Sequence, residues 1–127
     1  MSAPGDEFGL SVTPDRYLTV RYAGASGDFN PIHIDAEFAR SVGLPGEILH
    51  GLWSMAQVAR AHTEAFGGPA ALRALSVQFR GMGLPEKEVV VRGTVTEVGE
   101  EGVRTKAEAI QDGTRIVRGA QGLVRPA

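Results

Sequence analysis

HGLWSMAQVARAHTEAF, residues 50–66, predicts the one long amphipathic helix of this chain, closed by Gly67-Gly68-Pro69. Its apolar residues gather on one side of a helical wheel: Leu52, Met55, Val58, Ala59, His62 and Phe66. Trp53 falls on the polar side, where either a second subunit or a substrate path would cover it. On the apolar side, His62 is expected to be a core or interface histidine with one hydrogen bond rather than a catalytic residue.

The sequence after this helix changes from a helical period to an alternation of apolar and polar residues. This pattern predicts strands over residues 75–79, 88–98, 103–111 and 114–124. Hairpin turns at 99–102 and 112–113 make these strands an antiparallel meander of four. Helix 51–66 is the only long apolar element that can cover one face of the sheet. We therefore predict an α+β fold, a curved antiparallel sheet wrapped around one central helix.

The sequence before the long helix is more irregular. Residues 1–14 are rich in Pro, Gly, Ser and acidic residues and are expected to form a flexible lead-in to a single domain over 15–127. Residues 17–22 alternate like a strand that could join the sheet. Residues 34–42 have the fourfold apolar spacing of a short helix that ends at Gly43.

Between these last two segments lies YAGASGDFNPIH, residues 22–33. Asn30 is a favoured N-cap and Pro31 suits a first helical position, so Asp28 is expected in a turn and His33 in the first helical turn. That arrangement can bring Asp28 and His33 together, although five residues along a continuous helix would point them to different faces. An ionised Asp28 and a neutral His33 could hold and activate a water molecule. The alternative is that Asp28 only satisfies the turn and His33 packs beneath it.

Composition excludes several classes of function. A length of 127 residues suits one domain, and a net charge of −2 without basic runs gives no reason to expect nucleic-acid binding. The absence of cysteine excludes disulfides, thiol catalysis and cysteine metal sites. The acidic N-terminus lacks a signal pattern, and no stretch is apolar enough to span a bilayer, so a soluble cytoplasmic protein is predicted. The three histidines are far apart and lack ligand spacing, so no metal is expected.

The run from Tyr22 to His33, with Ala39 beyond it, resembles the signature of the MaoC-like, (R)-specific enoyl-thioester hydratases and dehydratases. The sequence ILHGL, residues 48–52, is similar to the family's second landmark. The segments GPA, residues 68–70, and VQFR, residues 77–80, resemble the small actinobacterial dehydratase subunits of type II fatty-acid synthesis. The resemblance covers about residues 17–124. It implies the hot dog fold, assembled as a homodimer or as a heterodimer with a related hot dog subunit.

Site residues follow from the same resemblance. Asp28 and His33 would be the catalytic pair, with the individual roles of acid and base left open. Asn30 would brace the turn and contact the water or His33. The backbone N–H of Gly51, at a helix N-terminus, would bind the thioester oxygen, a role that the helix dipole supports independently. At the position of a serine found in some bacterial hydratases this chain has Ala59, which removes a hydrogen bond.

The reaction implied is reversible hydration of a trans-2-enoyl thioester to an (R)-3-hydroxyacyl thioester, with fatty-acid metabolism as its setting. No metal, flavin or nicotinamide cofactor is implied, because coenzyme A or phosphopantetheine would enter only as part of the substrate. Two alternatives stay open: an acyl-thioester-binding or stabilising subunit of a larger dehydratase complex, which Ala59 favours, and a thioesterase of the same fold. The motif GDFNPIH, residues 27–33, makes the thioesterase the weaker alternative.

Overall fold

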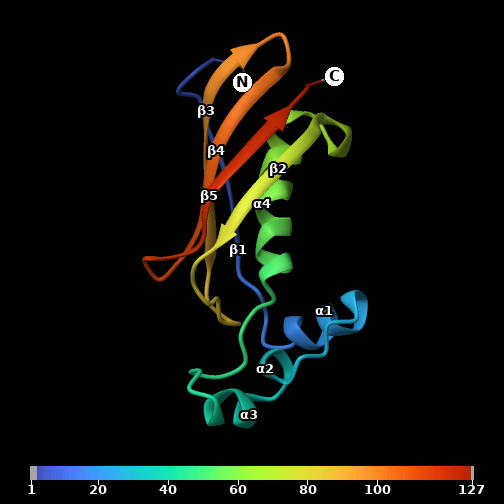
Figure 1. Cartoon of the computed structure of the whole chain (residues 1–127), viewed down its shortest axis with the longest axis vertical. Helices are drawn as coiled ribbons and strands as arrows, with labels where there is room; N and C mark the ends of the chain where they lie inside the picture. Colours follow the sequence, from blue (N-terminus) through green and yellow to red (C-terminus); the bar gives the residue numbers. More distant parts are fainter. Residues whose placement is uncertain (1–2, 127) are drawn as a thin grey trace.

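The computed structural model describes residues 3–126 and shows an antiparallel sheet with one long helix lying along its face (Figure 1). The strands are β1 (Glu7–Val12), β2 (Leu72–Phe79), β3 (Val89–Gly99), β4 (Gly102–Gln111) and β5 (Thr114–Val124). The helices are α1 (Leu18–Ser26), α2 (Pro31–Ile34), α3 (Ala36–Ser41) and α4 (Gly51–Phe66), with a 3₁₀ turn, η1, at Pro69–Ala71. The predicted α+β architecture, a curved antiparallel sheet around one central helix, is confirmed.

The order of the strands differs from the predicted meander. The five strands are arranged β1-β3-β4-β5-β2, so only β3, β4 and β5 follow one another as hairpins. β2 pairs with β5 instead of β3, and the chain then crosses the end of the sheet before β3 begins. The side chain of Gln111 holds this crossing, because its Oε1 accepts from Leu84 N and its Nε2 donates to the backbone oxygens of Leu84 and Lys87.

The prediction of a flexible lead-in over residues 1–14 is wrong for residues 7–12, which form β1 along the edge of β3. In β1, Phe8 and Leu10 point toward the core and alternate with exposed Glu7 and Gly9. A Cβ on Gly9 would lie 2.6 Å from the Val91 carbonyl oxygen, so the close approach of these two strands requires glycine there. The turn-forming composition of this segment hid a regular strand alternation. Residues 1–2 of the predicted lead-in lie outside the described part of the chain.

The prediction of a strand at residues 17–22 is also wrong, because this segment belongs to helix α1. Thr19 and Ala23, four residues apart, are its buried residues, which is a helical and not a strand period. The helix ends at Gly27, whose φ of 80° is left-handed and whose N–H donates to the Ala23 carbonyl. The segment is therefore a helix because its small residues are buried in the fold, although its large apolar residues alternate as in a strand.

The single helix predicted at residues 34–42 is divided into α2 and α3 by Asp35. Asn30 caps α2 as expected, with Pro31 at its first position, and its side chain accepts from Ile32 N. Asp35 has an extended backbone, and its carboxylate accepts from Phe38 N at 3.0 Å, which begins α3. Together with α1, these short helices lie beyond the end of the sheet where α4 begins (Figure 1).

Helix α4 has the predicted bounds but turns a different side toward the sheet. Trp53 and Gln57 are buried within the chain, and the Gln57 side chain donates to the Trp53 carbonyl. Trp53 is only 7% exposed, so the prediction that it lies on a side left uncovered by its own chain is wrong, whereas Leu52, predicted to face inward, is 62% exposed. Some of the apolar residues that the helical wheel predicted to face inward thus lie in the core, and others lie on a face that a single chain leaves exposed. The larger of two core clusters joins Trp53 and Val58 to the inward valines of β3. No helix within residues 3–126 is long and apolar enough to cross a membrane.

Candidate active site

Asp28 lies in the loop between α1 and α2, and backbone hydrogen bonds fix its direction. Its own N–H donates to Ser26 Oγ at 3.2 Å, and its Oδ1 accepts from Asn30 N at 3.2 Å. This Asx turn leaves Oδ2 free while the side chain stays half exposed, at 52%. The dense turn chemistry seen in the sequence therefore aims one carboxylate oxygen toward α2.

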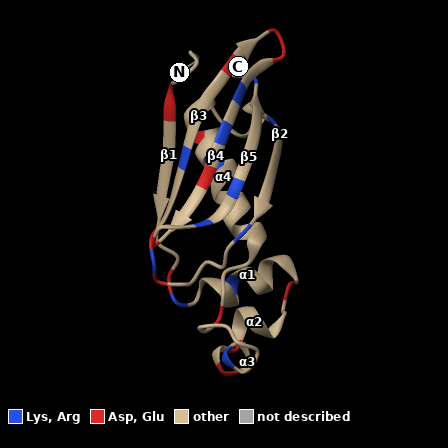
Figure 2. Ribbon diagram, turned by 60° about the vertical axis from the view of Figure 1, so that its left-hand side comes forward, with Lys and Arg blue, Asp and Glu red and all other residues tan. Residues whose placement is uncertain are grey.

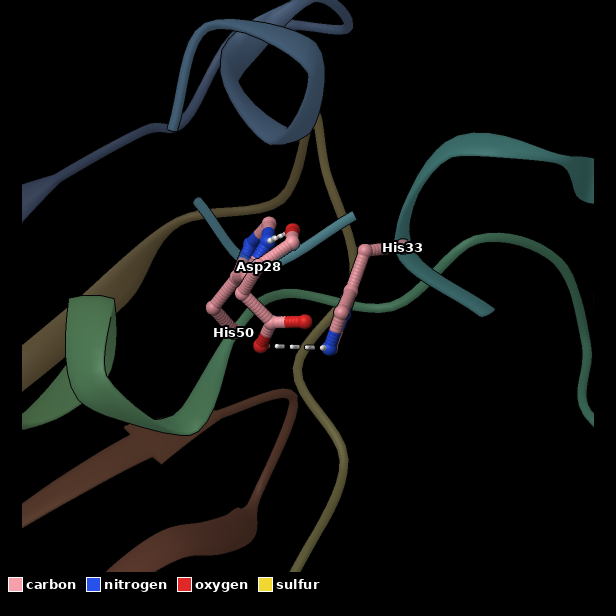
Figure 3. A group of neighbouring side chains, drawn as sticks. All are labelled: Asp28, His33 and His50. Atoms are coloured by element: carbon pink, nitrogen blue, oxygen red, sulfur yellow. Dashed lines mark hydrogen bonds and ion pairs between the residues drawn. The ribbon is translucent and has the colours of Figure 1, made fainter. Parts of the chain in front are cut away.

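His33, in α2, receives that oxygen: its Nε2 lies 3.7 Å from Asp28 Oδ2 (Figure 3). The other ring nitrogen, Nδ1, lies 2.8 Å from the Ile48 carbonyl oxygen. A carbonyl can only accept, so Nδ1 carries the proton and Nε2 of the neutral ring has a free lone pair. The ring is buried at 7% exposure. The turn and cap thus bring Asp28 and His33 together, across a gap slightly longer than a hydrogen bond.

A third side chain, His50, joins this pair, and sequence analysis had treated it only as a landmark beside Gly51. Its Nε2 lies 3.1 Å from the backbone oxygen of Asp28. Its ring stacks on that of His33, with centroids 3.9 Å apart and planes at 18° (Figure 3). Tyr22 contacts it as well, at 4.7 Å between centroids. Burial lowers the pKa of His50, although the hydrogen bond to Asp28 opposes the shift. The signal available in the sequence was its position directly before a helix that starts at glycine.

These three residues are also the only group of potential metal ligands among residues 3–126, with donor atoms within 4.8 Å of one another. The reason given for excluding a metal, that the histidines are far apart in sequence, therefore does not hold in the fold. The geometry supplies a different argument. Imidazole lone pairs lie in the ring plane, and rings stacked 3.9 Å apart at 18° keep their lone pairs in nearly parallel planes, which disfavours convergence on one ion. Absence of a metal stays a prediction.

Gly51 is the first residue of α4 and follows His50 directly, so the helix N-terminus adjoins the group. The first N–H that donates within this turn is that of Trp53, at 3.1 Å from the His50 carbonyl, which leaves the N–H groups of Gly51 and Leu52 ahead of it. A Cβ on Gly51 would lie 3.2 Å from the ring of Phe79. Phe79 and Leu52 are 49% and 62% exposed. An apolar surface therefore lies open beside the helix N-terminus.

His62 is a core histidine, as predicted, but with two hydrogen bonds instead of one. It is fully buried, with Nδ1 at 2.7 Å from the Val58 carbonyl and Nε2 at 2.7 Å from Thr105 Oγ1. Burial lowers its pKa, and the hydrogen bond to Val58 opposes that shift. Its ring also packs edge to face on Phe8. Ala59 is half buried on α4.

A groove lies elsewhere, on the face of the sheet opposite α4, across β1, β3, β4 and β5. Its cations include Arg92, Lys106 and Arg118, and Figure 2 shows the basic residues along these strands. Glu108 lies among them and pairs with Arg115 at 2.8 Å. The acid and base of the candidate site do not line this groove. We therefore place the chemistry at the start of α4.

The sequence matches the MaoC like domain over residues 2–116. The chain belongs to this family. Over 74 residues it is 46% identical to fatty acid synthase subunit beta of Aspergillus oryzae, covering 56% of this chain and 4% of that protein. Over 81 residues it is 36% identical to peroxisomal enoyl-CoA hydratase 2 of Arabidopsis thaliana, covering 62% of this chain and 25% of that protein. This MaoC-like chain thus spans a quarter or less of these relatives.

Among solved structures, the ChsH1-ChsH2 complex from Mycobacterium tuberculosis superposes with a TM-score of 0.89 at 21% identity, over all of both chains. At that identity the superposition supports the fold alone. The MaoC-like chain has the hot dog fold, and the resemblance to MaoC-like hydratases and dehydratases inferred from residues 22–33 is confirmed.

Proposed function

We propose that this protein catalyses the reversible addition of water to a trans-2-enoyl thioester, giving an (R)-3-hydroxyacyl thioester. The observation that carries the proposal is the approach of Asp28 Oδ2 to His33 Nε2, 3.7 Å apart beside the N-terminus of α4. The two relatives described above, an enoyl-CoA hydratase and a fatty acid synthase subunit, support the same class of chemistry. The location predicted from the sequence, the cytoplasm, stays part of the proposal.

The pair would act on one water molecule. His33 presents a lone pair on Nε2, because Nδ1–H is held by the Ile48 carbonyl. The free oxygen of Asp28 faces that lone pair, so a water molecule bound beside the two atoms can donate a hydrogen bond to each. As the water oxygen bonds to C3 of the enoyl group, one member of the pair takes a proton from it. This proton passes to the other member, which delivers it to C2. The pair ends the cycle with the number of protons it began with, and dehydration runs the same steps backwards.

Addition to C3 places negative charge on the thioester oxygen. The free N–H of Gly51 and the positive end of the α4 dipole offer a site for that charge. Asn30 would brace the arrangement, since its N–H binds Asp28 and its side chain caps the helix that carries His33. In this mechanism neither a metal nor a redox cofactor takes part. Coenzyme A or the phosphopantetheine of acyl carrier protein enters only as the thiol part of the substrate.

A second hot dog subunit, identical or related, would complete the site. Exposed apolar side chains surround the start of α4 in a single chain, including Leu52, Phe79 and Met82. Strand β2 pairs on one side only, with β5, and leaves its other edge free. The similar ChsH1-ChsH2 structure is a complex of two proteins. Sedimentation should give twice the chain mass of 13.4 kDa, or a complex with a related subunit, and a monomer at assay concentration would contradict this part of the proposal.

The test is enoyl-thioester turnover, followed by the loss of the conjugated double bond's absorbance for acyl chains of several lengths. Replacing Asp28→Asn or His33→Ala should lower kcat by at least about 10²-fold, because each removes one proton-transfer group. Asp35→Asn is the matched control: it also neutralises an aspartate of this segment, and asparagine still caps α3. Full activity in both site variants would overturn the proposed pair. Release of free thiol with the double bond retained would indicate a thioesterase, and binding of the thioester without turnover would indicate an acyl-binding subunit.

A further inference from the structure

His50 is a buried polar side chain to which the proposed reaction gives no task. It is 2% exposed, and its Nδ1 is the one buried side-chain nitrogen or oxygen without a hydrogen-bond partner among residues 3–126. Leaving such an atom unpaired destabilises the fold relative to a hydrogen-bonded one. A smaller apolar residue would avoid this cost. The histidine at this position therefore calls for a reason in what its ring and its other nitrogen contact.

We propose that His50 is a positioning residue that holds Asp28 and His33 in register with the N-terminus of α4. It touches neither the water nor the thioester in this scheme, and it acts through the groups on either side of it. The inference deepens the proposed hydratase function and rests on it for its kinetic consequences. Its structural part concerns the ring of His33 and is independent of the reaction.

The first connection is to Asp28. The Asp28 backbone oxygen can only accept, so the contact at 3.1 Å requires a proton on His50 Nε2. This hydrogen bond joins the loop after α1 to a residue 22 positions later in the chain. The Asx turn sets the direction of the Asp28 side chain locally, and His50 sets the position of the whole turn relative to α4.

The second connection is to His33. A ring stacked at 3.9 Å and 18° limits rotation of the His33 imidazole about its side-chain bonds, and the Ile48 carbonyl fixes the same ring at Nδ1. Together they aim Nε2 at Asp28. His50 must stay neutral for this, because two stacked cations would repel each other, and its burial lowers its pKa accordingly. When His33 takes up a proton during the reaction, the face of a neutral ring lies against the new charge.

The third connection is covalent. His50 is the N-cap residue of α4, so its Cα is one peptide from the Gly51 N–H that would bind the thioester oxygen. One side chain thus ties the acid, the base and the oxyanion donor to a single helix end. Small misplacement of reacting groups is costly in catalysis, and a shift of 1 Å can lower a rate by about 10²-fold.

Three variants separate the two contacts. His50→Phe keeps an aromatic ring and loses the N–H, His50→Gln keeps an N–H donor and loses the ring, and His50→Ala loses both. His62→Gln is the matched control, since it also replaces a buried, hydrogen-bonded histidine of α4 but one in the core. Kinetics should be measured per folded protein, with circular dichroism giving the folded fraction. Imidazole nitrogen NMR adds a direct structural readout, because the chain has only three histidines to assign.

We expect kcat of His50→Ala to fall by about 10²-fold with KM changed less than about threefold, and intermediate losses for the other two variants. The His33 Nδ1–H signal should be visible in the parent protein and in His62→Gln, and broadened by exchange with water in His50→Ala. A kcat of His50→Ala within about threefold of the parent, or an unchanged His33 signal, would overturn the proposal. If His50→Ala does not fold, the kcat values and His33 signals of His50→Phe and His50→Gln, which have side chains of similar volume to histidine, test the proposal instead. If the parent turns over no enoyl thioester, the hydratase proposal fails and the His33 signal alone decides the positioning role.

Discussion

Replacing His62 by glutamine should remove a measurable part of the acid sensitivity of this protein. Complete burial lowers the folded-state pKa of His62 from 6.5, and both ring nitrogens are hydrogen-bonded to neutral groups, Val58 O and Thr105 Oγ1. As pH falls below 6.5, the unfolded chain binds a proton at this residue that the folded chain does not bind, so stability is present above that pH and is lost as pH falls. At its steepest, the unfolding free energy falls by about 1.4 kcal/mol for each pH unit when one histidine is involved. For a chain of this length that corresponds to about 5 °C in Tm per unit.

The assay is chemical denaturation of the parent and of His62→Gln at several values between about pH 7.5 and pH 5, with the free energy of unfolding extracted at each. Glutamine cannot titrate, so its curve should be flatter by up to about 1.4 kcal/mol per unit, whatever constant offset the lost packing adds. His50, whose pKa is also lowered by burial, contributes a slope of the same sign in both proteins. Asp15, whose pKa Arg21 lowers from 3.8, would act only at more acid pH.

The prediction concerns the slope of the unfolding free energy against pH and not the constant difference between the two proteins. A difference in unfolding free energy that stays constant across this pH range would show that His62 binds protons equally in the folded and unfolded states. That outcome would refute the assignment of a neutral, sealed histidine between α4 and β4, together with its use as the core control for His50.

Three further substitutions, one of them with a matched control, test the core beside His62, the cap of α2 and the start of α4. Gly122→Ala should lower the unfolding free energy by about 1–3 kcal/mol in thermal or chemical denaturation, because its Cβ would lie 2.7 Å from His62 Nε2. Gly99→Ala is the control and should be close to neutral, because nothing lies within 4 Å of its Cβ. Equal effects of the two substitutions would contradict this packing. Asn30→Ala removes the cap of α2, so it should lower the unfolding free energy by about 1 kcal/mol in the same assay and should also lower kcat. An unchanged kcat would show that the cap does not contribute to catalysis. Gly51→Ala should lower kcat, because its Cβ would hinder the approach of the thioester oxygen to the N–H of residue 51. It should change the unfolding free energy little, since the facing Phe79 ring is half exposed and can move. An unaffected kcat would argue against an oxyanion donor at this position.

The relation of this chain to its relatives bears on how the function should be tested. The relatives reported above are far longer, and this chain matches only a quarter or less of each. Residues 3–126 nevertheless contain a five-stranded sheet and a long helix that share a core. The turnover assay should therefore be run both on the chain alone and with related hot dog subunits added.

Local sequence chemistry by itself determined the central helix, the four later strands and the turn that carries the acid and base. Each of these depends on short-range rules: apolar period, glycine at a helix end, and an asparagine cap followed by proline. The Asp28–His33 approach could be anticipated because a turn and a cap act within six residues. The same rules gave the wrong secondary structure at residues 7–12 and 17–22. In both segments glycine or small residues pack against parts of the chain that are distant in sequence.

Tertiary structure decided everything that depends on contacts between distant segments. The placement of β2 beside β5, the inward turn of Trp53 and the removal of His62 from water all follow from how the sheet closes on α4. The approach of His50 to Asp28 and His33 belongs to the same class, since 22 and 17 residues of chain separate them and no local period relates their positions. A sequence reports which side chains are able to pack or titrate, whereas burial, hydrogen bonding and stacking between remote residues exist only once the chain has folded.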